Sequence, residues 1–247
     1  MKNKPACILY SGGADSTLAA ALMLREHSPV HLLSFKHCRM SQLDKTTHAV
    51  QRFREHFGKD AVVHHWVDMT SLWRKISREP PHVSPGCGCH PLFAFLLKPC
   101  LACKVAMHQL TLAYCIRWEI PVVADGAHPG GASLFPEQLN EGIRVLQAFY
   151  RRYHIDYKNP VYGVDRPDFE IFKQGITGKK NTKDEHLYYS NQFACHVGLL
   201  AYIYHYLTRP FDRNKTKTTR LSVDFLERCL RKEKVSETLN QKVEEDE

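Results

Sequence analysis

Apolar and polar positions along the first half of the chain form blocks that predict strands and helices in alternation. Short apolar runs predict four strands, at 6–10, 30–35, 61–67 and 121–125. Stretches with helical spacing predict three helices between and after the first strands, at 16–26, 43–57 and 101–117. Strands that alternate with helices of this length pair in parallel through right-handed crossovers. We therefore predict an α/β fold, a parallel sheet with helices on both faces, in which Pro99 marks the start of the third helix.

The second half of the chain has a less regular pattern. It predicts a helix, then a polar and broken aromatic segment, then a buried apolar helix, at 137–152, 156–190 and 193–207. Residues 231–247 are charged and poor in core residues, so we expect them to be exposed and frayed. We interpret residues 1–208 as one domain with elaborations after residue 136. Residues 209–247 then form a basic, later charged, tail that is partly disordered.

Composition narrows the class of protein. The chain has 247 residues, 43% of them hydrophobic, which is enough for a substantial core. It has no run of about 18 apolar residues and no secretory signal, so we expect no membrane partner and a cytoplasmic location. Nine cysteines in that setting favour reduced, metal-binding or catalytic thiols over a disulfide framework. The formal net charge of +8 favours an anionic partner such as a nucleotide or RNA.

The most informative stretch runs from the first strand into the first helix, as Ser11-Gly12-Gly13-Ala14-Asp15-Ser16-Thr17. The glycines lack a Cβ and let backbone N–H groups approach a ligand, and the following helix directs its positive end at the same place. This is an anion cradle with added hydroxyl donors. A carboxylate at Asp15 fits beside a phosphate if a cation lies between them, or if it caps the helix instead. Neither the Walker loop nor the dinucleotide fingerprint is matched.

These residues resemble the pyrophosphate loop, S-G-G-x-D-S, of the N-type ATP pyrophosphatases, also called the PP-loop family. Members include tRNA thiouridine synthetases, GMP synthetase, asparagine synthetase and 7-cyano-7-deazaguanine synthase. The resemblance implies an adenine nucleotide alpha hydrolase-like sheet. It also implies ATP and Mg²⁺ held by Ser11, Gly12, Gly13, Asp15, Ser16 and Thr17, with Asp15 needed for catalysis. Such enzymes adenylate a carbonyl oxygen, release pyrophosphate, and let a nucleophile displace AMP.

Two further strand ends correspond to nucleotide-binding positions of this family. In the family that this sequence resembles, the end of the second strand holds adenine. Phe35 and Lys36 occupy that position here. A later strand ends in a short loop near the nucleotide, and Asp125 and Gly126 occupy that position here. We expect both strand ends to lie at the carboxyl edge of the sheet, where open α/β sheets bind ligands.

The cysteines distinguish among the chemistries of the family. Cys100 and Cys103 form a C-x-x-C pair at the predicted start of a helix, where the helix dipole and the neighbouring Lys104 lower a thiol pKa. Cys195 follows at long distance. This arrangement resembles the iron–sulfur type of tRNA thiouridine synthetase, which implies a [4Fe–4S] cluster held by these three thiolates. The persulfide type instead implies Cys103 and Cys195 as catalytic thiols.

Alternatives remain open for the metal site. Cys87 and Cys89 with Cys100 and Cys103 would form a four-cysteine Zn²⁺ site, and a third possibility is that the cysteines bind no metal. We expect two further cysteines to be core residues, Cys7 and Cys115. Among 15 histidines, three lie near motifs, at His90, His108 and His128. His108 lies one turn beyond Lys104, from where it would meet phosphate.

Three functions follow from these residues. The first is an adenylating enzyme that transfers sulfur to a nucleobase carbonyl, as in tRNA 2-thiolation, with a sulfur-carrier protein as a possible partner. The second is an amide- or nitrile-forming ligase on a small molecule, with zinc at the cysteines. The third is a nucleotide-binding protein without catalysis. Basic residues interleaved with Tyr150, Tyr153 and Tyr157 are compatible with base stacking, or with a solvated face whose aromatic residues are ordinary core residues. No known RNA-binding module is visible.

Overall fold

The computed structural model describes residues 4–41, 44–79, 91–128, 138–165, 194–195, 215–231 and 243–245. Within these ranges, side chains are described except at 44–45, 48, 91–97, 194–195, 215–219 and 243–245.

A six-stranded sheet organises the fold, in the order β6-β5-β1-β2-β4-β8. Five strands are parallel, at Ala6–Leu9 (β1), Val30–Lys36 (β2), Val62–Asp68 (β4), Val122–Ala124 (β5) and Asp156–Lys158 (β6). The four predicted strands are thus confirmed as adjacent and parallel. The sixth strand, Val243–Glu245 (β8), pairs antiparallel with β4.

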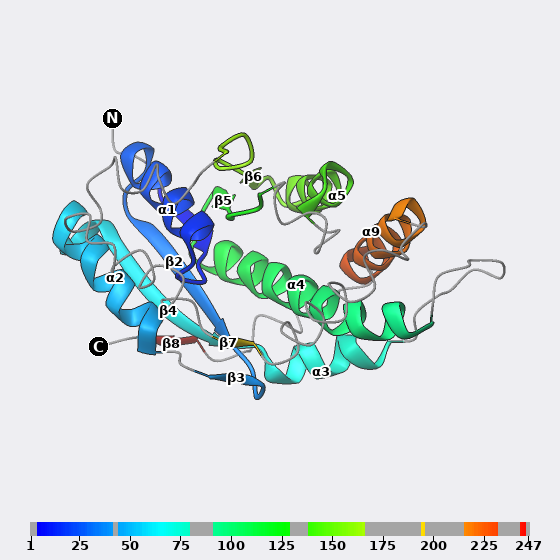
Figure 1. The fold of residues 1–247 in the computed structure, drawn as a ribbon. Coiled ribbons are helices and arrows are strands. Elements are labelled where there is room, and N and C mark those ends of the chain that lie inside the picture. Colours follow the sequence, from blue (N-terminus) through cyan, green and yellow to red (C-terminus); the bar gives the residue numbers. More distant parts are fainter. Residues whose placement is uncertain are drawn as a thin grey trace.

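Helices cover both faces of the sheet (Figure 1). One face carries the first two helices, Ala14–Glu26 (α1) and Asp44–Phe57 (α2). The other carries four, Thr70–Arg78 (α3), Pro91–Arg117 (α4), Asn140–Arg151 (α5) and Lys215–Arg231 (α9). Successive residues of a strand point to opposite faces, so Ile8 packs against α1 and α2 while Cys7 and Leu9 pack against the α4 side. Cys7 and Cys115 are both fully buried, as predicted.

The direction in which the strands are added to the sheet reverses beside the first strand. The chain runs from β1 to β2 and β4 on one side, and then crosses through α3 and α4 to β5 on the other side of β1. The carboxyl ends of β1 and β5 therefore meet where the direction of winding reverses, which is the ligand-binding place of open α/β sheets. The loop after β1 and the loop after β5 lie together at this edge, as the sequence predicted.

The start of α4 differs from the prediction. The helix begins at Pro91, ten residues earlier than the predicted start at Leu101, and Pro99 lies inside it. Proline suits the first position of a helix because its missing N–H is not needed there. Pro91 has this position, so the start signal assigned to Pro99 is wrong.

Two late segments form strands rather than the predicted helix or frayed end. Ala194–Cys195 (β7) pairs antiparallel with Met40–Ser41 (β3), so the start of the predicted helix 193–207 is wrong, and the rest of it lies outside the described residues. A short apolar run does not by itself separate strand from helix. The fraying expected of 231–247 is wrong for β8, which extends the sheet next to β4.

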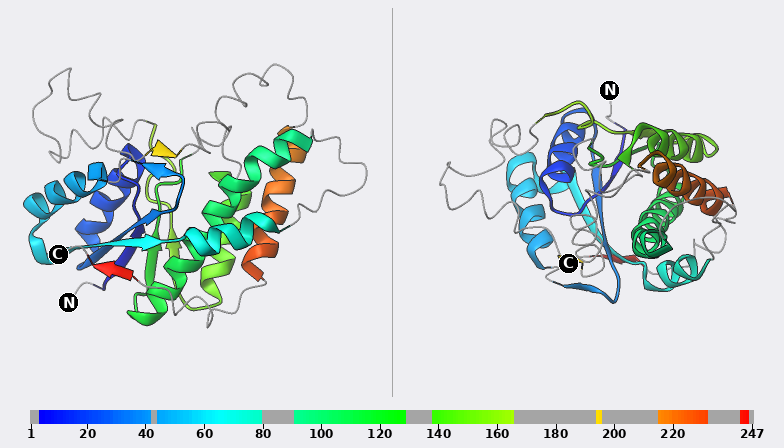
Figure 2. Two further views of the ribbon diagram at one scale, coloured as in Figure 1. Left: turned by 90° about the horizontal axis from the view of Figure 1, so that it is seen from below. Right: turned by 45° about the vertical axis from the view of Figure 1, so that its right-hand side comes forward.

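The helix α9 also forms part of the packed structure, not of a loose tail. Phe225, Leu226, Cys229 and Leu230 are buried in the core on the α4 side, and Figure 2 shows the helix lying along α4 and α5. The domain boundary at 208 stays a prediction. None of the described helices is long and apolar enough to cross a membrane.

Candidate active site

The loop from β1 into α1 is a tight turn around two glycines. Gly12 has a φ of 77°, a left-handed conformation that favours glycine. Gly13 is the N-cap of α1 and has no side chain with which to cap the helix, so Asp15 is not the N-cap residue. Asp15 lies in the first turn of α1 and is partly exposed. Its carboxylate is therefore placed at the helix end that attracts anions, which suits a bridging cation.

Two serine hydroxyls fix the shape of this loop. The backbone N–H of Ser11 donates to Oγ of Ser16 (3.3 Å), and that hydroxyl donates to the carbonyl of Gly13 (3.1 Å). The two serine hydroxyls also lie 3.1 Å apart. Thr17 is buried, with its hydroxyl 3.4 Å from that of Tyr10. The loop is therefore held in shape by its own hydroxyls before any ligand arrives.

The loop after β5 packs directly on the start of α1. A Cβ built on Gly126 would lie 2.6 Å from the backbone nitrogen of Ser16 and 2.8 Å from the carbonyl carbon of Asp15. Any real side chain there would push the two loops apart, because such distances are shorter than atomic contact allows. Gly126 thus joins the two predicted nucleotide-binding loops at one place.

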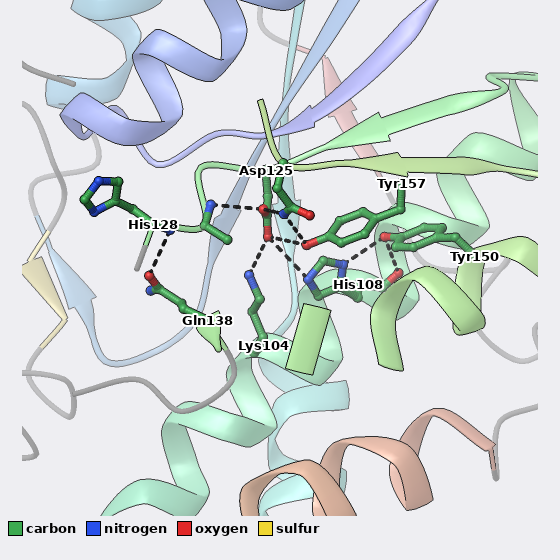
Figure 3. Close-up of polar contacts among 9 residues, drawn as sticks. Lys104, His108, Asp125, His128, Gln138, Tyr150 and Tyr157 are labelled. Carbon is green, nitrogen blue, oxygen red and sulfur yellow. Dashed lines mark hydrogen bonds and ion pairs between the residues drawn. The ribbon is translucent and has the colours of Figure 1, made fainter. Parts of the chain in front are cut away.

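Asp125, next to this glycine, is the centre of a buried polar network (Figure 3). One carboxylate oxygen accepts hydrogen bonds from Nζ of Lys104 (2.6 Å) and the hydroxyl of Tyr157 (2.7 Å). The other accepts from the Asn159 side chain (2.7 Å) and the backbone N–H of Ala127 (3.0 Å). Asp125 is 2% exposed, so its charge is balanced inside the protein by Lys104.

The surroundings of Asp125 determine its protonation. Burial alone would raise the pKa of the carboxyl, but the charge of Lys104 and the hydrogen bonds from Lys104 and Tyr157 lower it to about 2. Asp125 is therefore ionised throughout the neutral range. Removing one partner of such an ion pair strongly destabilises the fold, because the other charge is left buried without its partner.

His108 belongs to this network instead of a phosphate site. It lies on the same face of α4 as Lys104, as predicted, but its side chain is fully buried, with Nε2 3.8 Å from the Asp125 carboxylate and Nδ1 3.0 Å from the Tyr150 hydroxyl. Burial and the charge of Lys104 hold its pKa well below the usual range. A neutral, enclosed imidazole cannot reach a bound nucleotide, so the predicted phosphate contact is wrong.

His128 closes the loop after β5. Its backbone N–H donates to the Gln138 side chain (3.3 Å) and its ring Nε2 contacts the Val164 carbonyl. The loop that carries Asp125 and Gly126 is therefore anchored at His128, by Gln138 and by Val164. Figure 3 shows the contact with Gln138. His90 lies outside the described residues.

The end of β2 offers one accessible side chain of the two predicted there. Phe35 is buried in the core, whereas Lys36 is partly exposed. Ser34, next to them, is fully buried between the Tyr10 carbonyl (2.9 Å) and Nε2 of His64 (2.9 Å). Any contact of Phe35 with a base must therefore come from its backbone.

Cys100 and Cys103 lie on α4 near the candidate nucleotide site. Both are half-buried, and residues three apart on a helix share a face. Since α4 begins at Pro91, the field of the helix start does not reach them. Lys104 directly follows Cys103 and contacts Asp125 at the carboxyl edge of the sheet. The C-x-x-C pair therefore lies near that edge.

The third predicted cysteine is described by its backbone. Cys195 lies opposite Met40, which follows β2 and packs on the same core cluster as Cys103. Cys87 and Cys89 lie outside the described residues. Among the described side chains, no group of three or more potential metal ligands is present, and the two predicted cysteine sets each include a residue beyond them. Both sets stay predictions.

Sequence reasoning missed the two side chains that complete the Asp125 network. Tyr157 and Asn159 come from a short strand and turn in a segment expected to be irregular. Tyr150 and Tyr157 are buried, so the proposed stacking on bases is wrong for both of them. No periodicity marks β6, and its three residues were not predictable as a strand.

Comparison with known proteins gives a fold but no sequence family. No protein-family model matches the chain, and no curated protein matches it. Among solved structures, a 4-thiouridine synthetase in complex with RNA and bound ATP superposes with a TM-score of 0.58 at 16% identity, over 98% of this chain. The chain spans 55% of the length of that synthetase.

Two more solved structures match less well. The U34-tRNA thiolase NcsA from Methanococcus maripaludis, with its [4Fe–4S] cluster, has a TM-score of 0.44 at 14% identity over 94% of this chain and 74% of its own. A predicted subunit of tRNA methyltransferase from Methanocaldococcus jannaschii has a TM-score of 0.43 at 15% identity over 70% and 75%. The mainly parallel sheet, its helices on both faces and the match to the 4-thiouridine synthetase establish the predicted α/β fold, the adenine nucleotide alpha hydrolase-like (PP-loop) fold, for this chain.

Proposed function

We propose that this protein binds ATP with Mg²⁺ and uses it to adenylate a nucleobase carbonyl in RNA, which a sulfur nucleophile then converts to a thiocarbonyl. The observation that carries the proposal is the close approach of the glycine loop 11–17 and Gly126, at the edge of the sheet where open α/β sheets bind ligands. The shared fold with a 4-thiouridine synthetase solved with RNA and ATP supports the same class of reaction.

The triphosphate would lie on the start of α1. Backbone N–H groups of the first turn of α1 point toward an anion that binds there. The hydroxyls of Ser11 and Ser16 already hold the loop in shape. Asp15 fits Mg²⁺ because a partly exposed carboxylate at a phosphate site needs a cation between the two charges. The cation would offset the negative charge that develops on the leaving pyrophosphate.

The reaction then proceeds in two displacements. The carbonyl oxygen of the base attacks the α-phosphorus, and the bond to the β-phosphate oxygen breaks with release of pyrophosphate. A sulfur nucleophile, either HS⁻ or the terminal sulfur of a cysteine persulfide, next attacks the activated carbon, and the carbon–oxygen bond breaks with release of AMP. If the sulfur comes from a persulfide on Cys103 or Cys195, the thiolate of the other cysteine then breaks the sulfur–sulfur bond, and the two cysteines are left as a disulfide. The original carbonyl oxygen leaves with AMP, so the base exchanges oxygen for sulfur.

Lys104 and Asp125 are candidates for positioning residues in this reaction. Their ion pair ties α4, next to Cys103, to the loop that packs on the ATP site. The arrangement keeps the thiol-bearing helix and the nucleotide loop in one rigid unit. The basic balance of the chain, +8, fits an RNA substrate.

The cysteines would deliver sulfur. Cys100 and Cys103 share one helix face and are half-buried, and the backbone of Cys195, on β7, pairs with Met40 of β3; this set fits an iron–sulfur cluster or a persulfide pair. Cys100, Cys103 and Cys195 would hold such a cluster through their thiolates, and the cluster would supply a place for a sulfur donor to bind. A sulfur-carrier protein remains a proposed partner.

ATP binding and adenylation are tested with one variant, Asp15→Ala, and with one binding measurement on the wild type. Asp15→Ala should abolish ATP-dependent pyrophosphate release while leaving the thermal unfolding midpoint within a few degrees of wild type. Absence of ATP binding by calorimetry at millimolar nucleotide in the wild type would refute the proposal.

Anaerobic iron and zinc analysis addresses the nucleophile. Iron and sulfide that are lost in Cys195→Ala support the cluster. Stoichiometric zinc that is unchanged in Cys195→Ala contradicts the cluster and favours an amide- or nitrile-forming ligase with a closed tetrahedral site.

A further inference from the structure

A cavity lies beside the outer strand of the sheet, away from the loops described above. Its volume is about 610 Å³, within the range of small-ligand sites. Its walls come from the second half of α1, from α5 and from β6 with the turn that follows. Leu22 is eight residues beyond the start of α1, about 12 Å along the helix axis from the glycine loop. The cavity is therefore a site distinct from the candidate ATP site.

The outer edge of strand β6 forms one wall of the cavity. In the parallel pairing with β5, the N–H of Asp156 donates to the Pro121 carbonyl and the Lys158 carbonyl accepts from Asp125. Alternate residues of a strand direct their backbone groups to opposite sides, so the N–H and C=O of Tyr157 face away from β5. β6 is the outermost strand, and in the part of the chain that the structure describes nothing pairs with this edge. Tyr157 is 5% exposed, so these two groups sit in a recess.

The surrounding side chains suit a planar ligand with hydrogen-bonding edges. Asn140 and Gln147 contribute carboxamides, each with donors and an acceptor. Asn159 also lines the cavity, but its side-chain NH₂ donates to Asp125 and to the Tyr157 hydroxyl. Leu22, Met23 and Ile143 contribute apolar wall. The charged residues of the lining, Glu26 and Lys158, lie 4.0 Å apart, and their opposite charges add no net charge. Neutral polar groups with an apolar wall favour an uncharged, flat group over a phosphate.

We propose that this cavity binds a nucleobase through the backbone N–H and C=O of Tyr157. Adjacent donor and acceptor groups on one edge match N1 and the 6-amino group of adenine, or N3–H and a carbonyl of uracil, as base edges are read in RNA. An extended peptide is the other ligand that binds strand edges. β6 has three residues and presents one outward donor–acceptor pair, which is enough for a base but short for strand addition.

The site is joined to the candidate active site through the same tyrosine. The Tyr157 hydroxyl donates to Asp125 at 2.7 Å while its backbone faces the cavity, and Asn159 contacts Asp125 and lines the cavity. A base in the cavity thus contacts residues that position Asp125. The site adds a second nucleobase-binding place to the proposed function and does not depend on adenylation.

The test measures binding at Tyr157 in the absence of ATP. Protein labelled with ¹⁵N-tyrosine gives one amide signal for each of 11 tyrosines, and loss of a signal in Tyr157→Phe assigns residue 157. Titration with uridine or adenosine to millimolar concentration, and separately with an unmodified tRNA transcript, should shift this signal saturably. A shift with nucleosides shows that a free base is sufficient for binding. A shift with tRNA and not with nucleosides shows that the base must be presented by the RNA chain.

Variants locate the response. Gln147→Trp and Leu22→Trp fill the cavity from opposite walls and should each weaken binding at least tenfold. Arg144→Ala, on the exposed side of α5, is the matched control and should bind as wild type. If neither nucleosides nor tRNA move the Tyr157 signal, or if both filled variants retain the shift, the proposal is overturned. A shift produced by extended peptides and not by nucleosides overturns it in favour of strand addition.

Discussion

Gly126 and Ser16 approach so closely that a Cβ on the glycine would lie 2.6 Å from the backbone nitrogen of the serine. These residues come from loops that are 110 positions apart in the chain. The close approach requires the absence of a side chain, because both neighbours are backbone and cannot rotate away. It brings the loop after β5 onto the first turn of the helix that would hold the phosphates.

Gly126→Ala should therefore separate the two loops. We expect a loss of about 1–3 kcal/mol in the free energy of unfolding, as for other overpacked sites, and at least a tenfold weaker ATP affinity. Urea denaturation and calorimetry measure the two effects. Gly163→Ala is the control, since a Cβ there meets no atom within 4 Å. Unchanged ATP affinity in Gly126→Ala would show that the two loops do not act as one site.

The ion pair at Asp125 predicts a dependence of stability on acid pH. The ordinary pKa of Asp is 3.8, and Lys104 and Tyr157 lower that of Asp125 to about 2 despite burial. Because the folded pKa is the lower one, the ionised carboxylate stabilises the fold fully above about pH 4, and this contribution is lost as the pH falls through about 2. The shift corresponds to roughly 2 kcal/mol.

Asp125→Asn isolates this contribution. The difference in unfolding free energy between wild type and variant should be constant from pH 7 to pH 5 and should shrink below pH 4, as measured by urea denaturation at each pH. Asp156→Asn, at an exposed position on the same sheet edge, serves as the control. A difference that stays constant down to pH 2 would contradict an ionised, paired Asp125.

How far the sequence predicts this site depends on the kind of residue. The four predicted strands have continuous apolar runs because a parallel sheet is covered on both faces, and this signal is strong. The loop 11–17 was identifiable because glycines and hydroxyls are grouped within seven residues. Tyr157 and Asn159 reach Asp125 from 32 and 34 residues away, and nothing local in a three-residue strand shows that such contacts form.

A second acid-dependent group lies at the opposite end of the strands. Burial and the neighbouring His65 lower the pKa of His31 to about 4, and its Nδ1 lies 2.8 Å from the Tyr114 hydroxyl. The unfolded chain binds this proton more readily than the fold does, so stability falls as the pH drops below 6.5 and levels off below about 4. Since the ring is partly exposed, solvent screening reduces the effect to roughly 1–2 kcal/mol.

His31→Gln should remove this part of the pH dependence. The variant should lose less stability than wild type between pH 7 and pH 4.5, while the amide can keep a hydrogen bond to Tyr114. Thermal unfolding followed by circular dichroism at several pH values gives the comparison, with His56→Gln at an exposed position as control. Equal slopes for wild type and His31→Gln would mean that the ring protonates freely in the fold.

The helix near the C-terminus provides the test of domain organisation. The charges that dominate the composition of 209–247 predict a tail. Within it, however, a set of buried residues follows the spacing of a buried helix face: Ser222, Phe225, Leu226, Cys229 and Leu230. The amide of Gln109 on α4 donates to the Cys229 carbonyl at 3.2 Å, and the buried residues of α9 join the core on the α4 side. This packing predicts that α9 unfolds together with the sheet.

Leu226→Ala should therefore destabilise the whole protein. The side chain is fully buried, and truncating a buried leucine costs about 2–5 kcal/mol through lost burial and the cavity that remains. Asp224→Ala, at an exposed position on the same helix, should change stability by less than about 0.5 kcal/mol. Urea denaturation followed by tryptophan fluorescence reports on the sheet side, because Trp66 lies on β4 and Trp73 on α3. If the urea midpoint of this signal is the same in Leu226→Ala as in wild type, α9 belongs to a separate tail. A separate segment can lose its packing without affecting the sheet.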